Sequence, residues 1–450
     1  MQRRRVWMGA GLALAGTGLA GGSGLAGLSG CALLGTRITR GPYLQSGSDS
    51  GIVLRWRTSR PTDSLVRFGS VPDALSHSVH SAALTTEHQV ALSGLKPDTR
   101  YHYAVGSSEA MLAGADADHH FITSPPAGSA RPTRIWVIGD AGTGTAQQLA
   151  VRDAYRRFNG SGPTHLWLQL GDNAYDRGTD PEHQKLVFDV YADLLRSSVT
   201  WPTLGNHDTA DSTSPPDSLP YFQIFSLPGD GRCGGVPSGQ KLYYAFDAGD
   251  IHFICLDSMV SSRQPGSPML KWLEADLAAN RSGWTVAFWH HPPYTKGAID
   301  SDTEVNATEM RRHVLPLLEL HGVDLVLGGH SHVYERSVLL NGHYGESATL
   351  TDAMRLDAGS GRPQETGPYR KPVGRAPHKG TVYVVAGASG ESMKGPLNHP
   401  AMAVSASVAG SLVLDVVGNR LEGRYLTETG AVLDQFAIVK DGSAGAAGPV

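Results

Sequence analysis

Five short apolar runs in the middle of the chain each end at a turn that carries carboxylate, amide or imidazole side chains. The runs cover residues 135–138, 166–170, 200–204, 286–289 and 325–327. Runs of this length, bounded by turn residues, predict buried strands. Because ligands of open α/β sheets gather where strand ends meet loops, the polar residues after the five runs could converge on one point.

Stretches with helical spacing separate these predicted strands, at residues 146–158, 181–196, 269–279 and 309–321. Strands that alternate with helices predict βα units. More predicted strands follow at residues 381–386, 411–417, 420–426 and 435–440, and Gly418-Asn419 predicts a hairpin turn. We expect residues 133–440 to form an α/β domain, with two mixed sheets packed as a sandwich and helices outside. Residues 357–379, rich in Gly, Pro and charge, predict a long surface loop.

Residues 39–124 show an all-β pattern instead. Apolar or alternating stretches at 52–58, 65–69, 88–92 and 100–105 are separated by turn residues. Residues 95–101 read L-x-P-x-T-x-Y, which resembles the fibronectin type III signature. Its tyrosine, here Tyr101, typically fixes a corner through a backbone hydrogen bond, and a plain core aromatic is the alternative. The pattern predicts a fibronectin III-like domain, and the Pro-rich residues 125–132 predict a linker.

The length of the chain limits the number of domains, and its net charge excludes several classes of partner. The chain has 450 residues, enough for two or three domains. Its formal net charge of -4 gives no basic footprint for nucleic acid or an anionic membrane surface. No internal repeat is visible, and the sequence does not indicate an oligomeric state. Residues 441–450 are small and polar enough to predict a disordered tail.

The first residues resemble a bacterial export signal. Arg3-Arg4-Arg5 precede a charge-free, weakly apolar stretch to residue 36, which resembles a twin-arginine signal. Leu28-Ser29-Gly30-Cys31 resembles a lipobox, in which Cys31 is lipidated and becomes the mature N-terminus. We expect residues 1–31 to direct export and the protein to be a periplasmic or cell-surface lipoprotein. A plain cleaved signal and an uncleaved anchor are the alternatives.

Two cysteines remain after Cys31 is set aside. Cys255 lies in an apolar run, and Cys233 lies in a Gly-rich loop. An exported chain could oxidise them to one disulfide, or both could stay reduced, and the sequence leaves both outcomes open.

The polar residues after the five runs form a set of metal donors. They are Asp140, Asp172, Tyr175, Asn206, His290, His330 and His332. One ion of four to six ligands cannot use all seven and still admit water or substrate, whereas two ions that share Asp172 can. Oxygen and imidazole donors without thiolate favour iron, manganese or zinc. Phenolate is an uncommon ligand, so Tyr175 indicates ferric iron.

Single motifs of this kind carry little weight alone. A Gly-Asp after a strand is usually a turn, and we assign His252, His313 and His343 to structural or surface roles. The five sites differ because order, strand context and chemistry agree across all of them.

In chain order the five motifs read G-D-x-G, G-D-x-x-Y, G-N-H-D, H-x-P and G-H-x-H. This set resembles the calcineurin-like metallophosphoesterases, and Tyr175 together with Tyr334-Glu335-Arg336 resembles their purple acid phosphatase branch. The resemblance spans about residues 133–440, and the upstream domain fits that branch too. It implies an Fe3+ site and a second divalent site of Fe, Zn or Mn. The first would be Asp140, Asp172, Tyr175 and His332; the second would be Asp172, Asn206, His290 and His330.

The resemblance also implies a function. It implies an acid phosphatase-like enzyme that hydrolyses phosphomonoesters by attack of a metal-bound hydroxide, with His207 assisting the leaving group, and the N-terminal signal adds export. Asp208 would orient His207 or its loop. The position two residues before Pro292 selects His290 over His291, which would contact the phosphate or shape the loop. A phosphodiesterase or phospholipase on the same scaffold, and a vestigial surface-binding protein, are the alternatives.

Overall fold

The computed structural model describes residues 35–209 and 218–441. The predicted export signal with Cys31, and residues 442–450 of the predicted tail, lie outside the described residues. Within the described ranges, no helix is long and apolar enough to cross a membrane.

The strands that lead into the polar turns belong to two sheets. In one sheet, β7 (Thr133–Ile138), β8 (Leu166–Gln169) and β9 (Val199–Pro202) are parallel neighbours. In the other, β12 (Trp284–Trp289) and β13 (Leu325–Gly328) are parallel neighbours. All five predicted runs are therefore strands, and within each sheet their carboxyl ends meet at one edge.

The first sheet has the order β17-β22-β21-β20-β7-β8-β9. Its other strands are β17 (Tyr369–Lys371), β20 (Gly410–Val417), β21 (Arg420–Thr427) and β22 (Val432–Lys440). The predicted hairpin is confirmed, since β20 and β21 pair antiparallel and Val417 faces Arg420 across the two-residue turn.

The second sheet has the order β10-β11-β12-β13-β18-β14-β19. Its other strands are β10 (Tyr244–Ala248), β11 (Ile251–Cys255), β14 (Tyr334–Ser337), β18 (Val382–Ala386) and β19 (Met402–Ala406). Parallel pairs in the middle and antiparallel pairs at both ends make this sheet mixed, as expected. A small pair, β15 (Leu339–Leu340) and β16 (Arg355–Asp357), stands apart from it.

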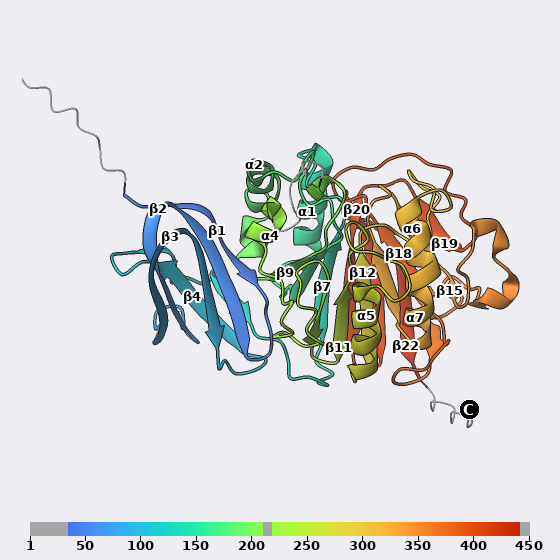
Figure 1. Ribbon diagram of the computed structural model, residues 1–450, viewed down its shortest axis with the longest axis horizontal. Helices are drawn as coiled ribbons and strands as arrows, with labels where there is room; N and C mark the ends of the chain where they lie inside the picture. The colour runs from blue at the N-terminus through green and yellow to red at the C-terminus, as the bar shows by residue number, and fades with distance from the viewer. Residues whose placement is uncertain (1–34, 210–217, 442–450) are drawn as a thin grey trace, which may run out of the picture. The chain divides into compact units, whose positions relative to one another are not determined.

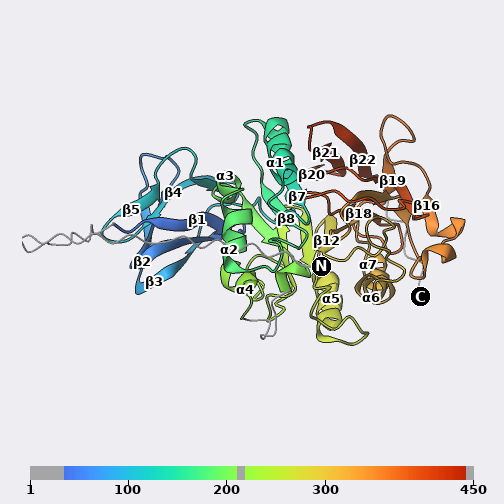
Figure 2. The same ribbon diagram turned by 90° about the horizontal axis from the view of Figure 1, so that it is seen from above.

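The two sheets lie face to face with helices on their outer sides (Figure 2). Helix α1 (Ala146–Asn159) covers the first sheet, while α5 (Pro268–Ala279), α6 (Val305–Glu309) and α7 (Leu315–Leu320) cover the second (Figures 1 and 2). Aromatic rings join the inner faces. Trp201 of β9 stacks on Phe246 of β10 with centroids 3.7 Å apart. Tyr334 of β14 stacks on Tyr425 of β21 at 4.1 Å.

The predicted helices are present, but two are less regular than their patterns suggest. The stretch 181–196 is broken into α2 (Asp180–His183), the π-helical η1 (Gln184–Phe188) and α3 (Ala192–Leu195). The stretch 309–321 continues α6 through the π-helical η4 (Met310–Val314) into α7. The wide turns of η4 precede Pro316, which has no amide hydrogen for the turn before it. Shorter elements are α4 (Pro220–Ile224), η2 (His207–Thr209), η5 (Ser347–Thr349) and η6 (Asp352–Met354).

The prediction of one unbroken loop over residues 357–379 is wrong at β17, which pairs parallel with β22. The reason is a buried ion pair, because Lys371 of β17 lies 2.7 Å from the carboxylate of Asp324. A charged residue in a Gly- and Pro-rich stretch gives no sign that it will be buried.

Residues 38–122 form a separate antiparallel network of strands. These are β1 (Ile38–Gln45), β2 (Gly51–Gly69), β3 (His77–Ser93), β4 (Arg100–Gly106), β5 (Met111–Gly114) and β6 (His120–Ile122). Where the sequence predicts two strands, β2 is one long strand that pairs with β1 in its first half and with β4 in its second. The amide of Lys96 donates to the hydroxyl of Tyr101 at 3.0 Å, which is the expected corner bond. Assignment to the fibronectin type III class stays a prediction.

The two described cysteines are free and buried. Burial raises the pKa of the Cys233 and Cys255 thiols to about 12. Both thiols therefore stay protonated near neutral pH, and the structure contains no disulfide between them.

Candidate active site

Three of the predicted ligands sit in a backbone conformation that side chains rarely adopt. Asp140, Asp172 and His330 have φ angles of 54°, 49° and 64°. Left-handed conformations at non-glycine residues cost about 1–3 kcal/mol each and cluster at functional sites. Each of these residues follows a strand and a glycine, so all three stand in a turn at the carboxyl end of a strand.

Two glycines allow the ligand turns to approach closely. A Cβ on Gly205 would lie 2.1 Å from the amide nitrogen of Asp172. A Cβ on Gly329 would lie 2.5 Å from Oδ2 of Asp140. Since any side chain there would collide with a predicted ligand, glycine at both positions is a packing requirement of the site.

The first group of predicted ligands surrounds the Tyr175 hydroxyl. Its oxygen lies 3.1 Å from Oδ2 of Asp172 and 3.0 Å from Nε2 of His332. The same oxygen lies 3.4 Å from Oδ1 of Asp140, and that Oδ1 lies 3.5 Å from Nε2 of His332. Four side chains from three different turns thus present one donor atom each to a single point.

The second group surrounds Nε2 of His290. This nitrogen lies 3.0 Å from Oδ1 of Asn206, 3.2 Å from Nδ1 of His330 and 3.5 Å from Oδ1 of Asp172. The other ring nitrogen, Nδ1, lies 2.8 Å from the carbonyl oxygen of Leu170. A carbonyl can only accept, so Nδ1 carries a proton, and in the neutral form of the ring Nε2 is the nitrogen that offers an electron pair to a metal.

The spacing within both groups fits two metal ions. Two ligand atoms held about 2.1 Å from one ion lie roughly 3.0–3.4 Å apart at octahedral to tetrahedral angles. The donor atoms of each group lie between 3.0 and 3.5 Å apart along the contacts just described. Asp172 offers Oδ2 to the first group and Oδ1 to the second, which is the arrangement of a bridging carboxylate.

Electrostatics around Tyr175 favour a cation. Burial raises the pKa of the Tyr175 hydroxyl far above its ordinary value, and the carboxylates of Asp140 and Asp172 raise it further. Burial also raises the pKa of Asp140. Burial acts to raise the pKa of Asp172, but the imidazole of His290 lowers it below the ordinary value. A buried group of two carboxylates and a phenol needs positive charge before all three can ionise.

The paired imidazoles of the second group cannot both carry charge. Burial acts to lower the pKa of His290, but Asp172 and Asp140 raise it to about 9. Burial and the neighbouring His290 lower the pKa of His330 to about 3. His330 is therefore a neutral imidazole, the form that binds metal.

His207 lies at the rim of the two groups and is partly exposed. Its amide donates to Oδ1 of Asp172 at 2.7 Å, and its Nδ1 donates to the carbonyl of Asp176 at 2.7 Å. Its ring lies 4.3 Å from that of Tyr175. The side chain thus stands beside the ligands, with Nε2 as its free nitrogen.

Asp208 is buried and binds the loops instead of the His207 ring. Its carboxylate accepts from the amide of Gly205 at 2.8 Å, the amide of Asn173 at 3.1 Å and Nδ2 of Asn173 at 2.9 Å. Burial and the nearby Asp172 raise its pKa to about 7. Of the two expected roles, orientation of the loop matches these contacts.

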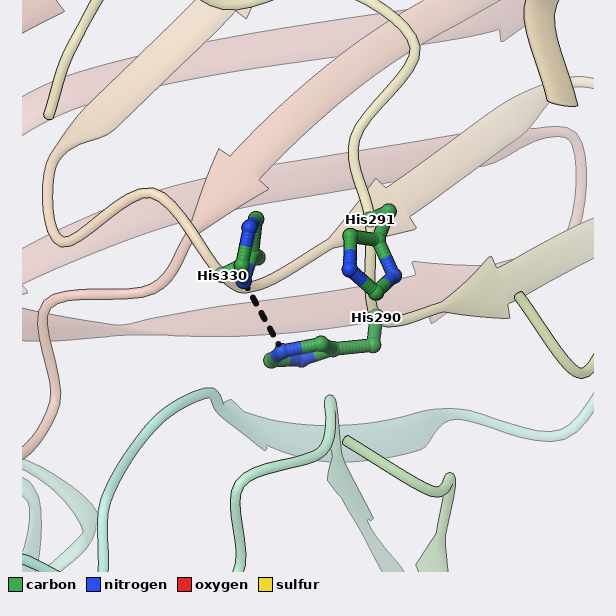
Figure 3. A group of neighbouring side chains, drawn as sticks. All are labelled: His290, His291 and His330. Carbon is green, nitrogen blue, oxygen red and sulfur yellow. Dashed lines mark hydrogen bonds between the residues drawn. The ribbon is translucent and has the colours of Figure 1, made fainter. Parts of the chain in front are cut away.

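The ring of His291 lies close to the rings of the predicted ligands His290 and His330. Figure 3 shows its ring grouped with those of His290 and His330, and one nitrogen of each ring lies within 4.8 Å of the others. However, Nδ1 of His291 is 2.9 Å from Oγ of Ser258, while His290 also belongs to a group with Asp140 and Asp172. The proximity of His290 to both carboxylates, whose oxygens lie within 4.8 Å of its ring nitrogen, favours it as the ligand.

Several residues that complete the site had no signal in the sequence. Ser258 holds His291, the carbonyl of Asp176 holds His207, and Asn173 joins Asp208 to the carbonyl of Thr203 at 3.0 Å. These are single polar residues far apart in the chain, so only the fold reveals their roles. By contrast, His252, His313 and His343 bind other groups, as expected.

Two protein families match this chain. The calcineurin-like phosphoesterase family matches residues 133–334, and the purple acid phosphatase N-terminal domain matches residues 40–123. All of the predicted metal ligands lie within the first range.

Named relatives include purple acid phosphatases of plants. Purple acid phosphatase 15 of Arabidopsis thaliana is 29% identical over 319 residues, which cover 61% of this chain and 57% of that protein. Purple acid phosphatase 23 of the same plant is 30% identical over 275 residues, covering 55% and 57%. An uncharacterized protein of Mycobacterium tuberculosis is 27% identical over 403 residues, covering 78% and 69%. The matched region spans little more than half the length of the two plant relatives.

Solved structures with the same fold include a purple acid phosphatase from yellow lupin seeds, with a TM-score of 0.70 and 17% identity over 89% of this chain and 74% of that chain. The structure of PhoD has a TM-score of 0.64 and 12% identity, covering 90% of each chain. The chain therefore contains a calcineurin-like phosphoesterase domain preceded by a purple acid phosphatase N-terminal domain, and it is similar in sequence and in fold to purple acid phosphatases.

Proposed function

We propose that the chain is an exported acid phosphatase-like enzyme that hydrolyses phosphomonoesters at a dinuclear metal centre. The observation that carries the proposal is the convergence of seven donor side chains from the ends of five strands, with Asp172 between two groups. The match to a phosphoesterase family supports the class of reaction.

We assign Fe3+ to the group around Tyr175 and a second divalent ion, Fe, Zn or Mn, to the group around His290. The first site uses Asp140, Asp172, Tyr175 and His332; the second uses Asp172, Asn206, His290 and His330. When bound, two adjacent cations supply Lewis acidity, which lowers the pKa of water and offsets charge on the phosphoryl oxygens.

The protein's own contribution is to place a proton donor at the rim of this centre. Because Nδ1 of His207 is bound to the carbonyl of Asp176, Nε2 is the nitrogen that can face the substrate. In the imidazolium form, Nε2 donates a proton to the oxygen of the leaving group. The bond from the His207 amide to Asp172 fixes this ring relative to the shared carboxylate. His291 is a candidate contact for the phosphate.

A phosphodiesterase or phospholipase on the same scaffold is the main alternative, because these activities can share one set of ligands and differ in the pocket walls. A vestigial binding protein is less consistent with seven intact donors. We further propose export by the twin-arginine route and attachment through lipid at Cys31, on the basis of the N-terminal sequence.

Metal analysis combined with paired substrates tests the function. We expect about two metal ions per chain and faster hydrolysis of 4-nitrophenyl phosphate than of bis(4-nitrophenyl) phosphate. A faster rate on the diester would favour the phosphodiesterase alternative. Full metal content without hydrolysis of either substrate would favour the vestigial alternative.

A further inference from the structure

Helix α2 fixes the turn of residues 175–179, which carries Tyr175, through hydrogen bonds. The carboxylate of Glu182 accepts hydrogen bonds from several amides of this turn. These are the amides of Asp176 at 2.9 Å, Arg177 at 3.2 Å and Thr179 at 2.9 Å. Thr179 is also the N-cap of α2, and Glu182 completes its capping box. The position of the turn therefore follows the position of α2.

The same turn also fixes the position of the His207 side chain. The carbonyl of Asp176 binds Nδ1 of His207, and a Cβ on Gly178 would lie 2.6 Å from Cα of Asp208. A displacement of the turn would thus move Tyr175 and the proposed proton donor together.

The other side of α2 is bound by two arginines of the N-terminal domain. The guanidinium of Arg57 in β2 donates one hydrogen bond to each oxygen of the Asp180 carboxylate, and both nitrogen–oxygen distances are 2.7 Å. Arg40 of β1 donates to Oδ1 of Asp180 at 2.9 Å, to its carbonyl at 3.1 Å and to Oε1 of Gln184 at 2.8 Å. Paired bonds of this kind fix direction as well as distance.

Burial and aromatic contacts confine the guanidinium of Arg40 to its position beside Asp180. The residue is 2% exposed, and its guanidinium lies over the ring of Phe188 at 4.6 Å. Tyr43 of β1 packs against the same ring at 4.8 Å. A buried guanidinium needs its carboxylate partner, so α2 is held in one place against β1.

We propose that the N-terminal domain positions the turn of residues 175–179 through Asp180, with Arg40 and Arg57 as positioning residues for Tyr175 and His207. Asp180 follows Tyr175 by only five residues, and the capping box of α2 connects them rigidly. The kinetic part of this inference rests on the proposed function, but the structural part does not.

Hydrogen–deuterium exchange of the full chain tests the structural part. The variants are Asp180→Asn, which keeps an acceptor for Arg40, and Arg57→Met at a side chain 26% exposed. Glu87→Gln is the matched control, because Glu87 of β3 is the other carboxylate bound by Arg57 and lies within the N-terminal domain. We expect several-fold faster exchange over residues 173–184 in both variants, with unchanged exchange in β7 and β12.

The kinetic readout uses the metal-loaded protein. In both variants kcat should fall roughly 10- to 100-fold, because small displacements of a catalytic group are costly, while KM and metal content change little. Glu87→Gln should match the wild type in exchange and in kcat. Unchanged exchange over residues 173–184 in Arg57→Met, or faster exchange spread evenly over both domains, would overturn the inference. If the wild type hydrolyses no phosphoester, the proposed function fails. The exchange experiment still decides whether the N-terminal domain positions the turn.

Discussion

The Nδ1 atom of His207 lies 2.7 Å from the carbonyl oxygen of Asp176, the residue after Tyr175. The ring that is proposed to protonate the leaving group is thus held by the backbone of the turn that presents a predicted metal ligand. This geometry separates the proton donor from the ligands and makes its role testable.

His207→Ala should keep both metals and lose about 10²–10⁴-fold in rate on alkyl phosphates, the usual value of general acid catalysis. The loss should be smaller for 4-nitrophenyl phosphate, whose leaving group needs no proton. His330→Ala is the contrasting variant, since it should deplete the second metal and lose activity on both substrates. Equal losses on both substrates in His207→Ala, with metals retained, would contradict the acid role. Metal loss in that variant would identify His207 as a ligand.

Tyr175→Phe should abolish the visible absorption of ferric-loaded protein, because phenolate-to-iron charge transfer requires the phenolate. The measurement is an absorption spectrum of protein with known iron content. Tyr334→Phe is a useful control, since its hydroxyl is buried 2.7 Å from Asp434, away from the predicted ligands. An unchanged band in iron-replete Tyr175→Phe would show that the assignment is wrong.

His290→Ala and His291→Ala should differ in metal content. His290 contacts both Asn206 and Asp172, whereas His291 is bound to Ser258. We expect His290→Ala to lose the second ion and His291→Ala to retain it with a raised KM for phosphoester. The opposite pattern, measured by elemental analysis, would exchange the two roles.

Because of His252, the free energy of unfolding should decrease as the pH rises into the alkaline range. Burial acts to lower its pKa, but the bonds to Asp247 at 2.6 Å and Asp276 at 2.7 Å raise it from 6.5 to about 9. The raised pKa contributes stability that is fully present below about pH 6.5 and is lost as the pH rises through about 9. At about 1.4 kcal/mol per pKa unit, the effect is on the order of a few kcal/mol.

Urea unfolding of wild type and His252→Gln on either side of this window measures the effect. The difference in unfolding free energy should be large at about pH 6 and small at about pH 10. His378→Gln, a change at an exposed histidine, should show no such trend. A pH-independent difference for His252→Gln would mean that the ring acts through packing alone.

Cys31→Ser should release the exported protein from membranes, because the proposed anchor is a lipid on that thiol. Cell fractionation of wild type and variant checks this outcome. Wild-type protein found free in the cytoplasm would contradict both export and lipidation.

The strands and the ligand turns were predictable because their signals are local. An apolar run followed directly by a turn with Asp, Asn or His describes a strand, a turn and a donor within a few residues, and all five such runs are strands. Contacts between distant segments gave no such signal. Asp208 binds Asn173 and Gly205, Lys371 reaches Asp324, and Arg57 reaches Asp180. In each case the partner is set by the packing of elements far apart in the chain.

The division of the ligands between two sheets has a consequence for assembly. Asp140, Asp172, Tyr175 and Asn206 follow strands of one sheet, whereas His290, His330 and His332 follow strands of the other. In the proposed assignment, each ion therefore cross-links both halves of the sandwich, and neither half carries a complete coordination shell. Metal uptake should be cooperative with the docking of the sheets, so that a chelator acts on this protein as a denaturant of its central interface.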